Sequence, residues 1–401
     1  MTTASEASDV TIVGAGLAGA AAAAVLARAG HRIALVDPDP VCPPAFKAEK
    51  IEPDQAELLE RLGLLQGILP HTAPIHAIRL GYRGRALATQ AIEQHGILYQ
   101  DLVNAVRRQV PTSVATRKAR AVELVTGAEL QTVILDSGER ITSRLLVVAC
   151  GTGGRLHRAL GIEKRILREA HSLCSGFDIA SEDGKPFPFA AVTYYAERLA
   201  TRIDYATLFA APGRMRVNLF SYHEPRDPWV RALSDAPHAE LERALPGLTR
   251  VIGSWCVTSR VEHRVIDLYV AEKPARDGVV LIGDAFQSVC PATGTGLSKV
   301  LTDVWRLCEA HVPAWLTTPG MGVDKIAAYY GDPAKTSMDR GSLEAAEYRR
   351  RFGTDDSLRW RVHRARCFGS MALAGLRVRM RHALAAGTPP ARQGPRVDRT
   401  L

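Results

Sequence analysis

The sequence predicts an α/β fold in which a parallel βαβ unit is interrupted by an inserted antiparallel sheet and followed by C-terminal helices. An apolar strand (9–13), a glycine turn, a helix (20–28) and a second strand (32–36) form one βαβ unit, whose crossover should be right-handed. In the middle of the chain, strand-like runs follow one another at 190–195, 202–209 and 214–222. Beyond them, the apolar run 278–282 restores the α/β pattern.

Between the first unit and the insertion, helices alternate with strands. Residues 54–66 and 97–109 carry apolar side chains at helical spacing, which predicts two amphipathic helices. Residues 113–150 alternate like strands, with a hairpin turn at Asp136-Ser137-Gly138, and the run 145–149 fits a buried parallel strand. Further helices are expected at 227–246, 297–310, 335–350 and 356–385.

These elements divide the chain into four parts. We expect a discontinuous first domain (1–164 and 271–330), an inserted sheet domain (165–270), C-terminal helices (331–386) and a disordered tail rich in Pro, Gly and Arg (387–401). The 401 residues are enough for one large α/β unit with an interleaved second domain. The composition, 46% hydrophobic and 23% charged, is that of a globular protein.

The formal net charge of +9 has two interpretations. A positive surface would attract anionic cofactors or substrates, whereas a solvated, Arg-rich surface needs no partner, and we favour the second. Basic residues do not alternate with aromatic ones and no nucleic-acid motif is present, so nucleic acid is rejected as the main partner. The Arg-rich stretch 359–379 could touch an acidic membrane surface, but a solvated or dimer-facing helix is favoured.

The cysteines indicate a reducing compartment. There are seven, widely spaced and without a Cys-x-x-Cys pair, which argues against a disulfide framework and against a zinc site. We therefore expect no bound metal and a cytoplasmic location. The first nine residues are small and polar, unlike a signal peptide, and the apolar stretch 17–27 is too short to cross a bilayer, so no integral membrane segment is expected.

A glycine turn of the form Gly-x-Gly-x-x-Gly lies directly between the first strand and the first helix. In such a turn the first glycine allows the tight bend, the second lets the backbone approach a pyrophosphate, and the third lets helix and strand pack closely. Asp37 ends the second strand, where a carboxylate can accept hydrogen bonds from a ribose and would repel a 2′-phosphate. The turn predicts a dinucleotide, FAD or NAD, bound at the helix N-terminus by Gly14, Ala15, Gly16, Ala18 and Gly19.

A second motif follows the strand-like run 278–282, where residues 283–303 read GDAFQSVCPATGTGLSKVLTD. With the glycine turn, it resembles the flavoprotein aromatic hydroxylases, the para-hydroxybenzoate hydroxylase-like FAD monooxygenases, over residues 1–385. The resemblance implies a Rossmann-like FAD-binding domain with an inserted antiparallel-sheet substrate domain. It implies that Asp284 bonds the ribityl chain, that the loop 291–296 lies beside the isoalloxazine ring, and that the next helix stabilises anionic reduced flavin. The residues expected at FAD are Gly283, Asp284, Pro291, Gly294, Thr295, Gly296 and Leu297.

Other positions compare less closely with the family. Lys47 stands where an Arg often faces the pyrophosphate, and Gln100 where an Arg or Gln often lies near FAD; for each, an ordinary surface role is an equal alternative. Cys150 replaces the Asp of an Asp-Gly motif that the family uses for FAD and NAD(P)H. Direct reduction by NADH or NADPH is thereby in doubt, and a separate flavin reductase is an alternative. A redox role for Cys150 or Cys290 is disfavoured against that of a buried small residue.

The resemblance implies hydroxylation of an aromatic or other electron-rich small molecule by O₂, through a flavin C4a-hydroperoxide. Such an enzyme needs no side-chain nucleophile, but a base that deprotonates a phenol would help. The catalytic residues stay open, and the candidates are Arg216, Tyr222, His223 and Pro291. Further polar candidates, each with a structural role as the favoured alternative, are Tyr194, Tyr195, Arg202, Asp204, Tyr205, Asn218, His71 and His76. A monomer or a homodimer is expected.

Three other functions stay open at this stage. A flavin halogenase would share the fold but requires a Lys beside the flavin and a Trp-x-Trp-x-Ile-Pro motif, which this sequence does not contain. A reductase or dehydrogenase of the geranylgeranyl-reductase type would act on alkenes without O₂. A flavin-binding redox sensor or a degenerate scaffold would bind FAD without turnover.

Overall fold

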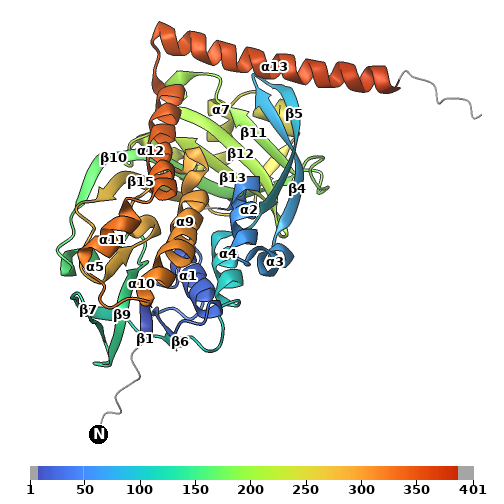
Figure 1. Cartoon of the computed structure of the whole chain (residues 1–401). Helices are drawn as coiled ribbons and strands as arrows, with labels where there is room; N and C mark the ends of the chain where they lie inside the picture. Colours follow the sequence, from blue (N-terminus) through green and yellow to red (C-terminus); the bar gives the residue numbers. More distant parts are fainter. Residues whose placement is uncertain (1–7, 48, 387–401) are drawn as a thin grey trace, which may run out of the picture.

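The computed structural model describes residues 8–47 and 49–386, and these form two sheets with helices packed around them (Figure 1). One sheet is mainly parallel and the other mainly antiparallel, which confirms the predicted α/β architecture with an inserted sheet. The expected tail, 387–401, lies outside the described residues. None of the described helices combines the length and the apolar character needed to cross a membrane.

The first sheet has seven strands in the order β6-β2-β1-β9-β8-β7, with β16 also paired to β9. Strands β6, β2, β1, β9 and β16 are parallel, and β7, β8 and β9 form antiparallel hairpins. Apolar clusters cover both faces, which explains why its strands are continuous apolar runs. The bounds are β1 (Ser8–Val13), β2 (Ile33–Val36), β6 (Ala115–Arg117), β7 (Ala121–Val125), β8 (Gln131–Leu135), β9 (Arg140–Val148) and β16 (Val279–Leu281).

Helices α1 (Leu17–Arg28), α4 (Tyr99–Arg107) and α9 (Thr295–Trp305) pack on one face of this sheet. The alanines at positions 20–24 of α1 are fully buried, and their small side chains allow close packing. Helix α1 begins at Leu17, three residues before the predicted start, because Gly16 is its N-cap. The shorter helices nearby are α2 (Pro53–Arg61), α3 (Leu65–Ile68), α5 (Arg155–Ala159), α10 (Val312–Leu316) and α11 (Val323–Tyr330).

The second sheet has nine strands in the order β14-β10-β13-β12-β11-β4-β5-β3, with β15 also paired to β10. All neighbours are antiparallel except β11 and β4. The bounds are β3 (Lys50–Ile51), β4 (Ala73–Tyr82), β5 (Arg85–Gly96), β10 (Lys164–Ser181), β11 (Ala191–Tyr195), β12 (Ile203–Ala211), β13 (Arg214–Ser221), β14 (Trp255–Val257) and β15 (Glu262–Ala271).

The second sheet extends beyond the segment 165–270 that the sequence predicted for it. Strands β3, β4 and β5 belong to the earlier segment 50–96, and β4 joins the sheet by pairing in parallel with β11. This pairing joins segments remote in sequence, so no local pattern predicts it. The chain passes between the sheets four times, because β3–β5 and β10–β15 belong to the second sheet and all other strands to the first.

One face of the second sheet is covered by α6 (Pro228–Asp235), α7 (Pro237–Ala244) and α8 (Leu248–Ile252). The predicted helix over 227–246 is therefore two helices. Pro237 has no N–H to donate and disfavours helical backbone at Ala236, where α6 ends.

Two long helices complete the chain. Helix α12 (Pro333–Thr354) packs against α9 and β12, and α13 (Leu358–Ala386) crosses the hairpin of β4 and β5 (Figure 1). Gly375 makes this crossing possible, because a Cβ at that position would overlap the carbonyl of Leu87.

Candidate flavin site

The glycine turn after β1 leaves one side open. Gly14 has φ +104°, and a Cβ there would lie 2.5 Å from the Ala149 carbonyl oxygen, while a Cβ at Gly19 would overlap the Gly14 carbonyl. Both glycines are therefore needed for packing. Gly16 differs, because the nearest neighbour of a Cβ there would be the Tyr99 hydroxyl at 3.9 Å. The free space beside Gly16, at the N-terminus of α1, suits a pyrophosphate.

Asp37 is held at the end of β2 beside this turn. Its carboxylate accepts the Ala15 N–H at 2.6 Å and lies 3.5 Å from the Arg107 guanidinium, which also donates to the Ala15 carbonyl. Gly14, Asp37 and Cys150 line a cavity of about 300 Å³. This cavity fits the adenosine half of a dinucleotide, with Asp37 able to reach the ribose.

The second motif lies directly against the first. Gly283 has φ +62°, and a Cβ there would lie 3.4 Å from both the Ala18 Cβ of α1 and the Val300 side chain of α9. Strands β1 and β16 both pair in parallel with β9, so the loops that follow them leave the same edge of the sheet. One extended ligand can therefore contact both loops, as FAD requires.

Asp284 faces two cations in the space between these loops. Its carboxylate lies 3.6 Å from the Lys47 ammonium and 3.9 Å from the Arg264 guanidinium. The Lys47 ammonium also lies 5.1 Å from the centre of the Tyr99 ring. Burial and the nearby Asp284 carboxylate raise the pKa of Tyr99, so its hydroxyl stays protonated and can donate. Gln100 follows Tyr99 in the first turn of α4.

The loop after Asp284 leads into α9. Pro291 begins a short 3₁₀ turn (Pro291–Thr293), Gly294 has φ +72°, and α9 begins at Thr295, two residues before the expected Leu297. The Gln55 amide donates to the Gly294 carbonyl at 2.9 Å and to the Ser298 hydroxyl at 3.1 Å. Gln55, which lies on α2, thus holds the loop before α9 in place. The sequence offers no spacing that would have marked it.

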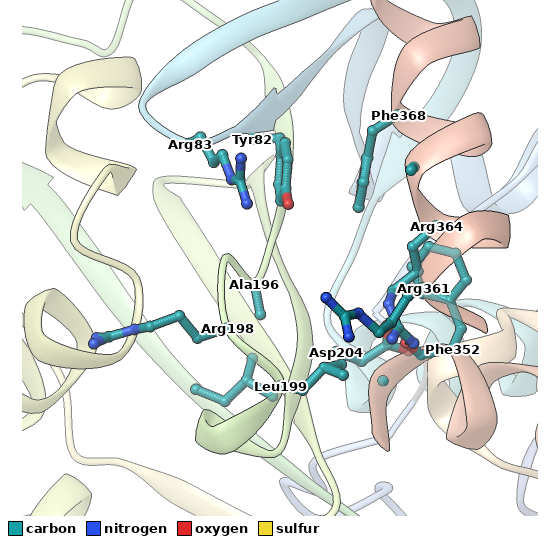
Figure 2. A pocket seen from close by; sticks show the side chains of 13 residues that line it. Tyr82, Arg83, Ala196, Arg198, Leu199, Asp204, Phe352, Arg361, Arg364 and Phe368 are labelled. Carbon is teal, nitrogen blue, oxygen red and sulfur yellow. The ribbon is translucent and has the colours of Figure 1, made fainter. Parts of the chain in front are cut away.

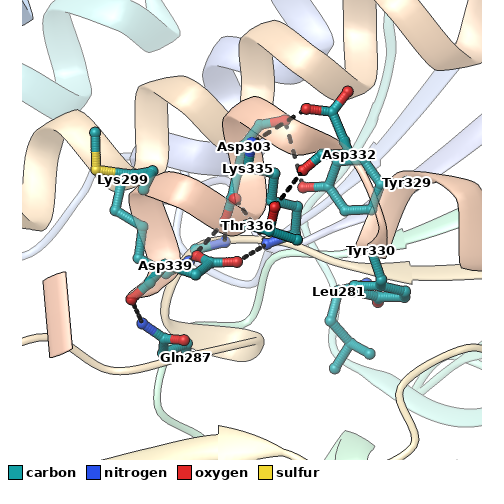
Figure 3. A network of polar contacts seen from close by, with 12 residues as sticks. Leu281, Gln287, Lys299, Asp303, Tyr329, Tyr330, Asp332, Lys335, Thr336 and Asp339 are labelled. Atoms are coloured by element: carbon teal, nitrogen blue, oxygen red, sulfur yellow. Dashed lines mark hydrogen bonds and ion pairs between the residues drawn. The ribbon is translucent and has the colours of Figure 1, made fainter. Parts of the chain in front are cut away.

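A buried ion network, whose members Figure 3 shows, holds the Gly283 turn through Asp303. Asp303 accepts the Gly283 N–H at 2.8 Å and pairs with Lys299 at 2.9 Å and Lys335 at 3.0 Å. Asp339 pairs with the same two lysines at 3.3 and 2.8 Å. Burial opposes ionisation of Asp303, but Lys299 and Lys335 hold its pKa below the ordinary value. Asp303 belonged to the recognised motif, whereas nothing in the sequence marked Lys335 or Asp339.

Three of the four catalytic candidates have structural partners. The Arg216 guanidinium is buried and pairs with Glu49 at 2.9 Å, Asp178 at 3.3 Å and Glu262 at 2.6 Å. The buried Tyr222 hydroxyl lies 3.3 Å from Asp204. These interactions explain both side chains without a role in catalysis.

His223 is likewise satisfied, since one ring nitrogen lies 2.8 Å from Asp227 and the other 2.8 Å from the Thr201 carbonyl. It also stacks on Trp229. Pro291, the fourth candidate, lies in the loop before α9. No general base is assigned among these four residues.

The remaining polar candidates are spread over the molecule. Tyr194 is buried with its hydroxyl on Glu197, and His76 pairs with Glu93 at the surface. Asn218 is buried beside Glu49, His71 ends a short 3₁₀ turn, and Arg202 caps another with φ +51°. Tyr195, Asp204 and Tyr205 gather around Arg349 of α12.

The two cysteines near the motifs are protonated thiols. Burial raises the pKa of Cys150, and it raises the pKa of Cys290 to about 11. A thiol is a poor nucleophile compared with a thiolate. This disfavours a redox role for either, although only Cys290 is fully buried and Cys150 is partly exposed.

Comparison with known proteins identifies the family. The family model described as the FAD binding domain matches residues 7–311, which include both glycine-bearing loops. The chain belongs to this FAD-binding family. FAD is therefore its cofactor, and the resemblance to FAD-dependent monooxygenases is confirmed.

Curated relatives of this flavoprotein are monooxygenases. Kynurenine 3-monooxygenase of Salinispora arenicola is 24% identical, over 92% of this chain and 84% of the relative. Ubiquinone hydroxylase UbiL of Rhodospirillum rubrum is 25% identical, over 80% of this chain and 76% of the relative. Among solved structures, p-nitrophenol 4-monooxygenase PnpA of Pseudomonas putida has a TM-score of 0.73 at 17% identity. The match covers 95% of this chain and 97% of PnpA, which shows a shared fold.

These findings place the flavoprotein among the FAD-dependent monooxygenases, oxidoreductases that act on a small molecule and O₂. A nicotinamide cofactor is the typical reductant of such enzymes.

Asp284→Ala is expected to weaken FAD binding about ten- to a hundred-fold, because one charge-assisted hydrogen bond contributes about 1.5–3 kcal/mol. Titration of the apoprotein with FAD, followed by flavin fluorescence, measures the change. Asp324→Ala, at an exposed position on α11, is the matched control. Full flavin affinity in the Asp284 variant would show that this carboxylate does not contact the cofactor.

Proposed function

We propose that the protein hydroxylates an electron-rich aromatic small molecule with O₂. The observation that carries this proposal is an apolar, partly aromatic cluster on the loop before α9. Phe220 and Tyr205 pack with Cys290 and Ala292, and the Tyr205 hydroxyl donates to the Ala292 carbonyl at 2.7 Å. These side chains are largely buried, so a substrate ring bound beside the flavin loop would meet apolar and aromatic neighbours.

FAD, when bound, supplies the oxygen-transfer chemistry. The chain's own residues bind and orient it. The N-terminus of α1 and Lys47 hold the phosphates, and the N-terminus of α9 favours negative charge at the ring end of the cofactor. The apolar cluster around Cys290 excludes water, which protects reactive species from hydrolysis. Gly14, Ala15, Gly16, Ala18, Gly19, Asp37, Lys47, Gln100, Gly283, Asp284, Pro291, Gly294, Thr295, Gly296 and Leu297 are the proposed FAD-binding residues.

The test is oxygen-isotope incorporation during turnover with a panel of phenols, aminobenzoates and polycyclic aromatics. Under ¹⁸O₂, a hydroxylated product should carry one labelled oxygen atom. Turnover without O₂ would favour the reductase, a requirement for halide would favour the halogenase, and FAD binding without any turnover would favour a sensor or scaffold.

The source of electrons is NADH or NADPH, acting directly or through a separate reductase. Anaerobic mixing of the FAD-loaded protein with each nucleotide distinguishes the two routes. Because the pKa of Cys150 is raised by burial, Cys150→Ser should keep the rate of flavin reduction within about two-fold. A loss of reduction in this variant would assign a redox role to the thiol. The cytoplasmic location and the monomeric or homodimeric state stay predictions.

A further inference from the structure

A second cavity, of about 430 Å³, lies between the second sheet and the C-terminal helices (Figure 2). Its walls are the β4–β5 turn, the short 3₁₀ turn before β12 (Leu199–Thr201), the end of α12 and the start of α13. It is separate from the cavity beside Gly14. Asp204 lines it and pairs with Arg349, whose guanidinium lies 4.7 Å from the centre of the Tyr205 ring. Tyr205 in turn contacts the loop before α9, so these side chains separate the cavity from the flavin loop.

The lining of this cavity is rich in arginine. Four arginines line it, namely Arg83, Arg198, Arg361 and Arg364. Among the described residues, Asp204 is the one carboxylate in the lining, and both of its oxygens are engaged by Arg349, at 2.8 and 2.5 Å. Asp204 therefore does not neutralise the four lining guanidinium groups. Arg198 donates to the Arg243 carbonyl at 3.0 Å, and Asp355 and Asp356 act on Arg364 from outside the lining. Such a cavity attracts an anion.

Arg364 provides an independent sign of a missing partner. Its Nη1 donates to the Phe352 carbonyl at 3.0 Å, whereas its Nη2 is buried and has no hydrogen-bond partner among the described residues. Buried donors in folded proteins are almost always paired, because an unpaired one is costly. Because Arg364 lines the cavity, a small rotation of its side chain would let a ligand oxygen become that partner.

The remaining wall is aromatic. Tyr82 and Phe368 stack with ring centres 4.0 Å apart and planes at 9°, and Phe352 lies beside Phe368. Figure 2 shows the Arg361 side chain projecting from α13 toward the space between these rings and Asp204. Flat rings beside guanidinium groups suit a ligand that is both planar and anionic.

We propose that this cavity binds a planar aromatic carboxylate, with its carboxylate on Arg361 and Arg364 and its ring against Tyr82 and Phe368. The volume lies within the range of about 300–1,000 Å³ that small-molecule sites occupy. Arginine is suited to this task because its planar fork matches a carboxylate with two parallel hydrogen bonds. The proposal does not require the flavin to react.

Isothermal titration of the FAD-loaded protein with 2-naphthoate, a two-ring aromatic carboxylate, tests the proposal. Binding should be one to one, and 2-naphthamide, which keeps the ring but carries no charge, should bind at least about ten-fold more weakly. Affinity for 2-naphthoate should fall as salt is added, since Arg361 is exposed.

Substitutions locate the site. Arg361→Gln should weaken 2-naphthoate about ten-fold, and Arg364→Gln should do so at least as much. Arg366→Gln, at an exposed position on the same helix that does not line the cavity, is the control and should leave binding unchanged. Arg364 also donates to the Phe352 carbonyl, so Arg364→Gln could destabilise the fold. In that case Arg361→Gln alone still tests the proposal.

Three results would overturn the proposal. Equal binding of 2-naphthamide would show that the carboxylate is not recognised. Unchanged binding in Arg361→Gln would place the probe elsewhere. If NADPH displaces 2-naphthoate and Arg361→Gln weakens NADPH more than the probe, the cavity serves the reductant instead. The titration measures binding without turnover, so a failure of the proposed hydroxylation is distinguishable from a failure here, and the flavin absorption of each variant shows whether FAD is still bound.

Discussion

Asp303→Ala is expected to lower the free energy of unfolding by about 3–5 kcal/mol and to release FAD. The substitution removes the carboxylate that pairs with two fully buried lysines, Lys299 and Lys335, and leaves their charges short of a partner. It also removes the acceptor of the Gly283 N–H, which holds the second flavin loop in place. Denaturant unfolding of the apoprotein measures the first effect, and FAD titration measures the second.

The same network predicts a pH dependence. The pKa of Asp303 is lowered below its ordinary value of 3.8, so the stabilisation is fully present above that value. It is lost as the pH falls through the lowered pKa in the folded state. The wild-type protein should therefore lose more stability on acidification than Asp303→Ala does. Asp324→Ala serves as control, and a loss of less than 1 kcal/mol in Asp303→Ala would show that the network contributes little.

Gly16→Ala is expected to weaken FAD binding by about a hundred-fold while leaving the apoprotein folded. The backbone at Gly16, with φ −61° and ψ −173°, is accessible to any residue, and a Cβ there meets no close neighbour in the chain. The added methyl group would instead occupy the space proposed for the pyrophosphate. FAD titration and denaturant unfolding, performed on the same variant, separate the two effects.

Two further glycines act as references for this experiment. Gly19→Ala should destabilise the apoprotein itself, because its Cβ would overlap the Gly14 carbonyl. Gly341→Ala, within α12 and with no atom near its Cβ, should be neutral or stabilise by up to about 1 kcal/mol. Unchanged FAD affinity in Gly16→Ala would mean that the cofactor does not approach the turn at Gly16.

The sequence predicted the first sheet and the two flavin loops because their signals are local. A strand, a glycine turn and a helix lie next to one another in the chain, and each glycine has a role that spacing reveals. The same holds for the Gly283-Asp284 turn. The structure places these two loops side by side, since a Cβ added at Gly283 would lie 3.4 Å from the Ala18 Cβ.

Other features depend on contacts between remote segments and could not be predicted in this way. The pairing of β4 with β11 leaves no local pattern in the sequence, so the sequence predicted too few strands for the second sheet. Gln55 reaches the Gly294 carbonyl from α2, and Lys335 reaches Asp303 from α12. The candidates Arg216, Tyr222 and His223 were chosen for their chemistry on a predicted strand, and burial with ion-pair or hydrogen-bond partners explains them otherwise.

The repeated passage of the chain between its two sheets sets an order for biosynthesis. Strand β4 cannot find its parallel neighbour until β11 has been translated, and β9 receives β16 only after the whole intervening segment has left the ribosome. Neither sheet can complete its folding alone during translation, since each includes strands that are translated late. Flavin loading must therefore follow synthesis of α9, and until then apolar surface on both sheets lacks part of its cover.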